Sequence, residues 1–242
     1  MKQSLIIPVE KLLLFQEKKG AFPPSFWGEI AKKEIYNETK EIDRNLQKLQ
    51  IEKEKIFQIE LKKGIELKEK NIFSPIEVEV EEKIYKIVGE LDLLTNKGKI
   101  SLSQGNLSHL MQIWPEYLIY LHLPLKEKKE SILFVKGGKE KEVPIPSIQE
   151  SLKKYIAYFL KAKKSISFLM PDWAEKIFSR DKDGLKEKMI NSLNGKRGFI
   201  DPYIQWAVFP EEMNVEKIIK QWSPFLTEVF DPLLSKEKRG QR

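Results

Sequence analysis

Alternation of apolar and acidic side chains in residues 76–80 restricts the fold more than any other feature of the sequence. Ile76, Val78 and Val80 alternate with Glu77 and Glu79, and this is the period of a strand with one buried face. A second apolar segment, residues 83–94, comes next, and the segment ISLSQGN follows after the turn TNKGK. The pattern predicts a three-stranded meander, so the chain should fold around a sheet.

Helical spacing replaces this alternation on both sides of the predicted sheet. Apolar residues among lysines and glutamates recur at roughly helical intervals before it. They are Val9, Leu12, Leu13 and Phe15, and, after the break GAFPPSFWG, Ile30, Ile35, Ile42, Leu46, Leu49 and Ile56. We therefore expect residues 1–70 to form a helical N-terminal segment that packs on the core. Residues 71–242 should form an α/β domain with a helical C-terminal part.

Four further elements have their own local signals. The segment HLMQIWPEYLIYLHL is apolar nearly all round and predicts a buried helix that packs against the sheet, with Pro115 near its first turn or at a kink. SILFVKGGKEKEVPI predicts a hairpin in which both glycines supply positive backbone angles. A helix should start after Ser147, and a last helix should cover residues 214–230. In DKDGLKEKMINSLNG, Gly195 is a candidate C-terminal cap.

The residue content excludes several kinds of chemistry. The chain has no cysteine and two histidines, so thiolate metal sites, disulfides and cysteine nucleophiles are impossible. No phosphate-binding loop of the GxxxxGK(S/T) type is present. A hydrolase centre on His109 with Ser108 or Asp92 is disfavoured because no GxSxG elbow accompanies it. We expect no cofactor and no metal.

The sequence also bears on where the protein functions. It has no signal-peptide pattern at its start and no apolar stretch long enough to span a membrane. Because a chain without cysteine suits a reducing compartment, we expect a soluble cytoplasmic protein.

Positive charge is concentrated in one part of the chain. The net charge is +7 at pH 7, and residues 151–200 hold 12 basic and 5 acidic residues. Such a segment can contact nucleic-acid phosphates, or it can be an ordinary solvated surface. Lys153, Lys154, Lys161 and Lys164 lie off the apolar stripe of the helix that follows Ser147, and they are the candidates for DNA contact.

Tryptophans could provide a second means of binding nucleic acid, because bases stack on aromatic rings. They are spread along the chain and mostly lie in apolar runs, which favours core packing. The five are Trp27, Trp114, Trp173, Trp206 and Trp222.

Residues 89–106, GELDLLTNKGKISLSQGN, resemble the core of the PD-(D/E)XK nuclease fold. In the RecB-type branch of that fold a G-h-h-D strand precedes an apolar strand ending in D-Y-K and then a helix. The resemblance implies that two carboxylates coordinate Mg²⁺ and that a lysine assists the attacking water. Gly89 and Asp92 match the first strand.

The second strand departs from that pattern. Leu102 or Ser103 stands where the second carboxylate is expected, and Gln104 stands where the lysine is expected. One carboxylate and a glutamine do not hold a catalytic divalent ion. We therefore interpret Asp92, Ser103 and Gln104 as vestigial positions with no catalytic residue among them.

Most of the chain, residues 10–234, resembles the C-terminal nuclease-like domain of the RecC family, the gamma subunits of exodeoxyribonuclease V. The resemblance rests on the order and spacing of several segments. They are LLLFQEKKGAFPPSFWGEI with Gly20, Pro23 and Gly28, KIVGELDLL, LSHLMQIWPEYLIYLHL, SILFVKGGKEKEVPIP, and FIDPYIQWAVF with Asp201, Pro202 and Tyr203.

The resemblance implies a non-enzymatic role in a RecBCD-type complex that repairs double-strand breaks by homologous recombination. Its expected partners are RecB-like and RecD-like helicase subunits and DNA near the unwinding fork, with no membrane. Two alternatives stay open. The chain could be a metal-dependent nuclease whose acidic site is rebuilt from Glu77, Glu79 or Glu90 with Asp92, or it could be a plain nucleic-acid binder.

Overall fold

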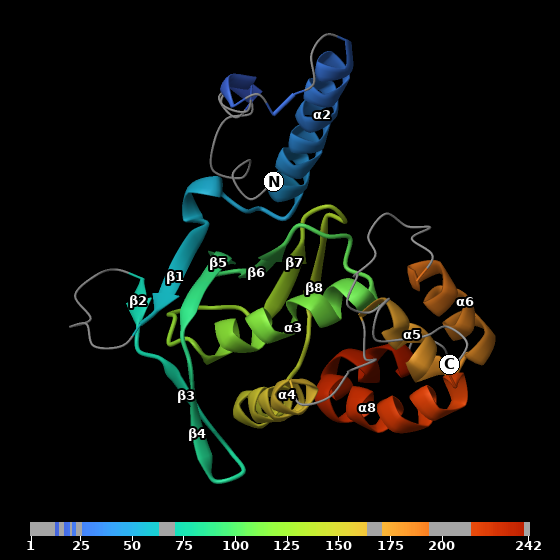
Figure 1. Ribbon diagram of the computed structural model, residues 1–242. Coiled ribbons are helices and arrows are strands. Elements are labelled where there is room, and N and C mark those ends of the chain that lie inside the picture. Colours follow the sequence, from blue (N-terminus) through green and yellow to red (C-terminus); the bar gives the residue numbers. More distant parts are fainter. Residues whose placement is uncertain are drawn as a thin grey trace. The chain divides into compact units, whose positions relative to one another are not determined.

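The computed structural model describes residues 13–14, 17–19, 21–22, 26–62, 71–163, 171–193 and 214–239. Eleven residues considered above lie outside these ranges. They are Val9, Leu12, Phe15, Gly20, Pro23, Lys164, Gly195, Asp201, Pro202, Tyr203 and Trp206. The fold is mixed α/β, as predicted (Figure 1). No helix in the described ranges has the length and apolar character needed to cross a membrane.

The chain folds as two units, each assembled from separated stretches. The first comprises Met1–Phe73, Gly89–Gly105 and Pro124–Glu142, and the second comprises Ser74–Val88, Asn106–Leu123 and Val143–Arg242.

The first unit contains a mixed sheet in the strand order β2-β1-β5-β6-β7-β8 (Figure 1). Its strands are β1 (Phe57–Leu61), β2 (Ile72–Phe73), β5 (Gly89–Thr95), β6 (Gly98–Ser101), β7 (Ser131–Phe134) and β8 (Lys139–Glu142). Strand β1 runs parallel to β2 and antiparallel to β5. Strand β6 runs antiparallel to β5 and parallel to β7, and β8 closes the sheet antiparallel to β7.

Helix α2 (Phe26–Lys48) covers one face of this sheet. The helix presents Ile42 and Leu46 to the strands, as its apolar period predicted. The buried cluster between them consists of Ile42, Leu46, Ile51, Leu93, Ile100, Leu133 and Val135. The hydrophobic core of the first unit therefore joins α2 to three central strands.

The helical prediction for residues 1–70 extends too far. Helix α2 ends at Lys48, a 3-10 turn covers Lys53–Lys55, and the next five residues are strand β1. Ile56 thus lies outside the helix that its spacing suggested. Pairing of β1 with β5 overrides the helical period of this segment.

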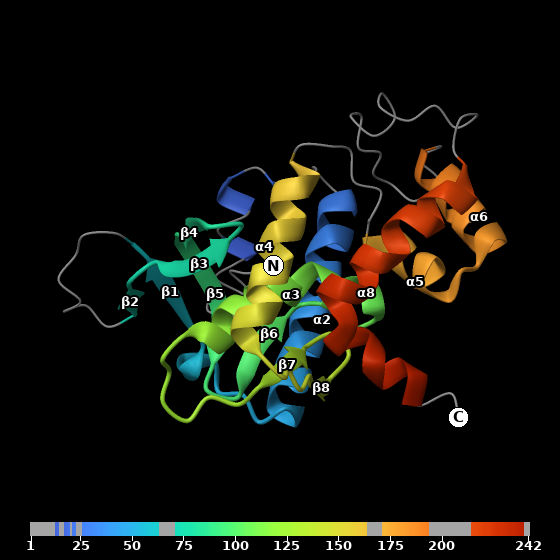
Figure 2. The ribbon, with the colours of Figure 1, turned by 90° about the horizontal axis from the view of Figure 1, so that it is seen from below.

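The second unit contains a two-stranded sheet and a group of helices (Figures 1 and 2). The elements are β3 (Ile76–Val80), β4 (Lys83–Ile87), α3 (Leu107–His122), α4 (Ile148–Ala162), α5 (Pro171–Ser179), α6 (Lys182–Leu193) and α8 (Val215–Arg239). Helix α3 packs on α4, α5 and α8, while α4 also packs on β3. Ile76, Val78 and Val80 are buried, as their alternation predicted.

The predicted meander is wrong in one respect. The segment 83–94 is two strands and not one, because the chain bends at Gly89, where φ is +126°. Strand β4 pairs with β3 in the small sheet, whereas β5 pairs with β1 and β6 in the large one.

The C-terminal helices agree with their signals in most respects. Ser147 caps α4 by accepting from the Glu150 N–H. Asn214 caps α8 by accepting from the Lys217 N–H. The helical backbone of α8 is interrupted at Phe230, where the sequence predicted that the helix ends, and helix then continues to Arg239. Pro232 removes a backbone donor there, which accounts for the kink.

Two side chains and one backbone angle depart from the sequence pattern. Trp114, Trp173 and Trp222 are buried as predicted, but Trp27 is 67% exposed. The stripe of α4 buries Leu152, whereas Phe159 at its far end is 48% exposed. In the β7–β8 turn Gly138 has a positive φ, and Gly137 does not.

Candidate functional site

The hairpin of β5 and β6 carries the residues that the sequence singled out. Leu94 lies opposite Lys99, and Thr95 opposite Gly98. The Thr95 hydroxyl donates to the Gly98 carbonyl at 3.0 Å and accepts from the Lys97 N–H at 3.1 Å. These bonds within the turn fix the register of the two strands.

Strand β5 contains a β-bulge at Asp92. Leu91 pairs with Ile59 and Leu94 with Phe57, so Asp92 and Leu93 together lie opposite the single residue Gln58. Leu93 has a φ of +56°, which a branched side chain rarely adopts. Because the bulge breaks the alternation, Leu93 and Leu94 are both buried.

Lys99 on β6 meets Asp92 at this bulge. Its side chain is 1% exposed, and its Nζ lies 2.7 Å from the backbone carbonyl oxygen of Asp92. The same Nζ lies 3.8 Å from Asp92 Oδ1, on a side chain that is 31% exposed. A buried ammonium therefore supports a carboxylate that remains partly open to solvent. Lys99 was not among the candidates predicted from the sequence.

The predicted vestigial positions lie close to this pair along the chain. Ser103 follows β6, and its hydroxyl lies 2.7 Å from that of Ser101, which is on the Lys99 side of β6 because strand side chains alternate. Leu102, the other residue at the position expected for the second carboxylate, is apolar and packs with the α2-side cluster. Gln104 is exposed.

Further acidic residues lie on β5 and β1. Glu90 lies directly opposite Glu60 and accepts a hydrogen bond from Gln58 Nε2 at 2.8 Å. Glu60 pairs with Lys62 at 3.6 Å. In the described ranges, no group of three or more histidine, aspartate or glutamate side chains has the geometry to hold a metal ion.

The two other acidic candidates belong to the two-stranded sheet. Glu77 forms an ion pair with Lys86 across the β3–β4 ladder, and Glu79 lies opposite Ile84. Both glutamates are exposed. Their surroundings are those of a solvated strand face.

The hydrolase arrangement on His109 is not assembled in the described part of the chain. His109 lies in the first turn of α3, where its backbone N–H donates to Asn106 Oδ1. Its Nδ1 is buried and makes no hydrogen bond to any described residue. A catalytic histidine needs an orienting acceptor at that nitrogen.

The candidate DNA-contact lysines follow one side of α4. Lys153 is exposed, while Lys154 and Lys161 line a hollow of about 400 Å³. Tyr158, Phe225 and Glu228 line it too. Lys161 Nζ lies 4.0 Å from the centre of the Phe225 ring, a cation–π geometry between two residues that line the hollow.

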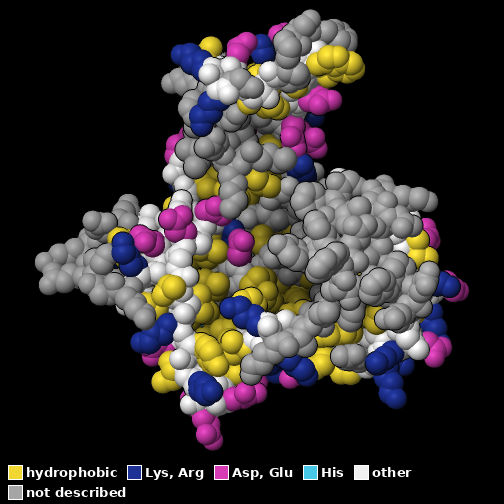
Figure 3. All heavy atoms as spheres, viewed as in Figure 1, with side chains coloured by type: hydrophobic (Ala, Val, Ile, Leu, Met, Phe, Trp, Pro, Cys, Tyr) yellow, Lys and Arg dark blue, Asp and Glu magenta, His cyan; other side chains and the backbone are white. Residues whose placement is uncertain are grey.

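Lys163 was not among the predicted candidates either. Its Nζ lies 5.1 Å from the centre of the exposed Phe159 ring. Acidic and basic side chains are interspersed over the described surface in Figure 3, which displays one face of the molecule. A binding site for an anion must therefore be sought in the local arrangement of side chains, since the overall charge of the surface does not single one out.

Comparison with known proteins adds no relative. A scan against models of protein families, a search of the curated proteins and a search of the solved structures each found no match to this chain.

Proposed function

We propose that this chain is a non-catalytic scaffold and DNA-guiding module of a RecBCD-type exodeoxyribonuclease V complex. In that role it acts in the cytoplasm, in double-strand break repair by homologous recombination. It binds RecB-like and RecD-like helicase subunits and contacts DNA near the unwinding fork. It needs no cofactor of its own.

The order of elements around Asp92 supports this proposal. A strand that carries Gly89 and Asp92 is followed by the antiparallel strand β6, the buried helix α3 and then β7, parallel to β6. This is the order of strand, strand, helix and strand that the resemblance implies. Strand β8 completes the predicted hairpin.

The contact between Lys99 and Asp92 is the observation that carries the non-catalytic assignment. The backbone carbonyl of Asp92 accepts from a buried ammonium, which also lies beside its carboxylate. Lys99 already neutralises this carboxylate, and a single neutralised carboxylate offers a divalent cation less negative charge than the two carboxylates that the resemblance implies. Ser101 and Ser103 offer hydroxyls there, which are weaker ligands for Mg²⁺ than carboxylates.

The hollow beside α4 supports the DNA-guiding part of the proposal. Two lysines and two aromatic rings line it beside Glu81 and Glu228. Cations and rings are the groups that bind a nucleic-acid strand, whose phosphates pair with cations and whose bases stack on rings.

Reconstitution tests the scaffold role. The purified chain is mixed with the RecB-like and RecD-like subunits of the same organism, and the mass of the mixture is measured by light scattering after size exclusion. The proposal predicts one stoichiometric complex. Separate elution of every component at its own mass would contradict it.

A metal-dependent nuclease is the second candidate, because Glu90 and Asp92 both lie on β5. It predicts Mg²⁺-dependent cleavage of DNA that is lost in Asp92→Ala and retained in Asp183→Ala, a change on exposed surface. The scaffold assignment predicts no cleavage that depends on Asp92.

A further inference from the structure

A second groove lies in the helical unit, and none of the α4 lysines lines it. It has a volume of about 710 Å³ and lies between the turn that joins α5 to α6 and one face of α8. The views in Figures 1 and 2 agree in placing α8 beside α5 and α6. The lining residues used below are Arg180, Lys182, Glu216, Lys220, Ser223 and Glu228.

Two cations in this groove are not neutralised by described residues. Lys182 forms an ion pair with Glu216, and the hydrogen bond from Lys182 holds the pKa of the Glu216 carboxyl below its ordinary value. The side chains of Arg180 and Lys220 make no ion pair or hydrogen bond within the described ranges. Glu228, which also lines the α4 hollow, is the other acid of the groove.

The backbone at Arg180 makes this residue costly in its position. Its φ is +56°, and it ends α5 in a Schellman motif, with Arg180 N–H donating to Ile177 O at 3.2 Å and Asp181 N–H to Lys176 O at 3.0 Å. Glycine is favoured at this site because it has no Cβ to strain. The guanidinium at this position makes no ion pair with a described residue and is therefore available to a ligand.

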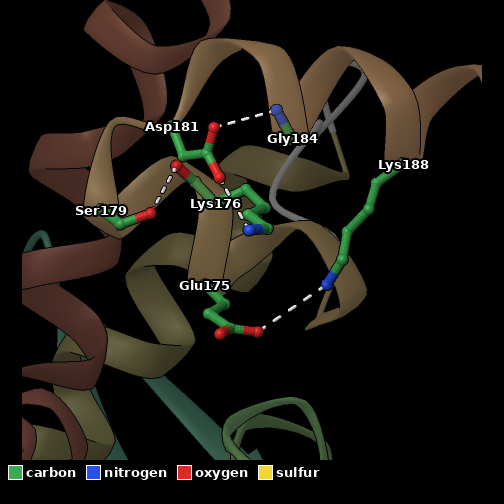
Figure 4. Close-up of polar contacts among 6 residues, drawn as sticks. All are labelled: Glu175, Lys176, Ser179, Asp181, Gly184 and Lys188. Carbon is green, nitrogen blue, oxygen red and sulfur yellow. Dashed lines mark hydrogen bonds and ion pairs between the residues drawn. The ribbon is translucent and has the colours of Figure 1, made fainter.

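Neighbouring contacts hold the backbone of the turn in which Arg180 lies. Asp181 Oδ1 accepts from the Gly184 N–H at 2.9 Å and caps α6, while Asp181 Oδ2 pairs with Lys176 Nζ at 2.7 Å (Figure 4). Ser179 Oγ donates to the Lys176 carbonyl at 3.3 Å in the same turn.

We propose that this groove binds phosphate groups, with Arg180 and Lys220 as the charged ligands and the Ser223 hydroxyl as a further donor. A guanidinium, an ammonium and a hydroxyl match the several oxygens of a phosphate better than the two of a carboxylate. The phosphate can belong to a free phosphate compound or to a nucleic-acid backbone. The inference does not depend on the scaffold role, since it involves none of the α4 lysines.

Two probes separate these sources. Binding of inorganic pyrophosphate to the full chain is measured by titration calorimetry, and binding of a labelled single-stranded oligonucleotide is measured by fluorescence anisotropy. Both are repeated with Arg180→Gly and with Lys220→Gln. Gln50→Gly is the matched control, because Gln50 ends α2 in the same motif with φ of +55° and is not part of the groove.

Arg180→Gly should raise the melting temperature, because it relieves the strained backbone, and yet weaken binding by about fivefold or more. Lys220→Gln should weaken binding similarly, whereas Gln50→Gly should leave binding unchanged. Weakened binding of pyrophosphate alone would assign a free phosphate compound, and weakened binding of the oligonucleotide would assign the nucleic-acid backbone.

The proposal is overturned if neither probe binds or if both variants bind each probe like the wild type. A lower melting temperature for Arg180→Gly would overturn the argument from strain. The variant Lys153→Gln/Lys154→Gln/Lys161→Gln distinguishes phosphate binding in the groove from DNA binding at α4. It changes only the α4 lysines, so pyrophosphate binding should stay intact.

Discussion

Lys99 combines near-complete burial with a positive charge, which proteins tolerate where the ammonium has partners. Its partners are the carbonyl and the carboxylate of Asp92, at the β-bulge of β5. The carbonyl precedes Leu93, whose positive φ sets the orientation of that peptide group. The bulge and the lysine therefore stabilise each other, and neither is a feature of an unconstrained strand pair.

Replacing Lys99 by methionine should destabilise the protein by about 1–3 kcal/mol, because the Asp92 carbonyl loses its charged donor in a buried place. The midpoint of urea denaturation measures this loss. Lys83→Met on the exposed strand β4 is the control and should shift the midpoint little. A midpoint for Lys99→Met at or above that of the wild type would refute the stabilising role.

The sequence did not distinguish Lys99 from the lysines around it. It belongs to the polar stretch TNKGK, which is typical of an exposed turn. Its burial depends on the bulge at Asp92 and on pairing with Ile132, which is far along the chain. Asp92 was predictable from the G-h-h-D pattern, whereas the group that contacts it was visible only in three dimensions.

At the scale of elements, Gly98 shows how closely β6 and β7 approach. Its φ is +148°, and an added Cβ would lie 2.3 Å from the Ser131 carbonyl oxygen. Gly89, at the bend between β4 and β5, has φ of +126° but open space around it. A side chain at Gly89 would therefore meet backbone strain alone, whereas a side chain at Gly98 would meet both backbone strain and a steric clash with β7.

Gly89→Ala should cost about 1–3 kcal/mol through backbone strain alone. Gly98→Ala should cost more, by roughly another 1–3 kcal/mol, because the new methyl group would force β6 from β7. Chemical denaturation of both variants checks the difference. Equal losses would mean that the strands can separate at little cost.

The turn between α5 and α6 should respond to acid. Hydrogen bonds from Lys176 and from the Gly184 N–H hold the pKa of the Asp181 carboxyl below its ordinary value of 3.8. Because the folded pKa is the lower one, the contribution of Asp181 to stability is present above the unfolded value and is lost as the pH falls through the folded value.

Asp181→Asn should therefore lower the melting temperature at about pH 6, and it should lose less stability than the wild type between about pH 6 and pH 2. Thermal unfolding at a series of pH values checks both points. Asp231→Asn, an exposed change on α8, should retain the acid sensitivity of the wild type. An unchanged pH profile for Asp181→Asn would argue against the ion pair.

Elements with complete local signals were predictable from the sequence. Helix α4 has a capping serine and an apolar stripe, and β3 has strict alternation. Strand β1 was missed because its five residues continue an apparently helical spacing. Only its pairing with β5 and β2, which lie later in the chain, makes them a strand. Likewise, nothing local revealed which sheet β4 and β5 would each join.

At the scale of the whole molecule, the most basic stretch of the sequence lies in the second unit. Residues 151–200 hold 12 basic and 5 acidic residues, and all of them fall in the second unit. The charge excess was predictable from composition. The sequence did not predict which basic residues line the hollow beside α4 and which line the groove on α8, because both surfaces depend on how the helices pack.

If the α4 lysines contact DNA, the affinity of the chain for duplex DNA should fall with salt in proportion to the phosphates neutralised. Lys153→Gln/Lys154→Gln/Lys161→Gln should then reduce the slope of log affinity against log salt by about 2–3, since each lost contact removes about 0.9. Fluorescence anisotropy across a salt series measures the slope.

A change of the same net charge elsewhere is the control that this prediction requires. Lys33→Gln/Lys48→Gln/Lys55→Gln removes three exposed charges from the first unit. Because counterion release counts direct phosphate contacts, this control should leave the slope close to that of the wild type. Equal flattening by both triple variants would mean that net charge, and not the surface of α4, determines DNA binding.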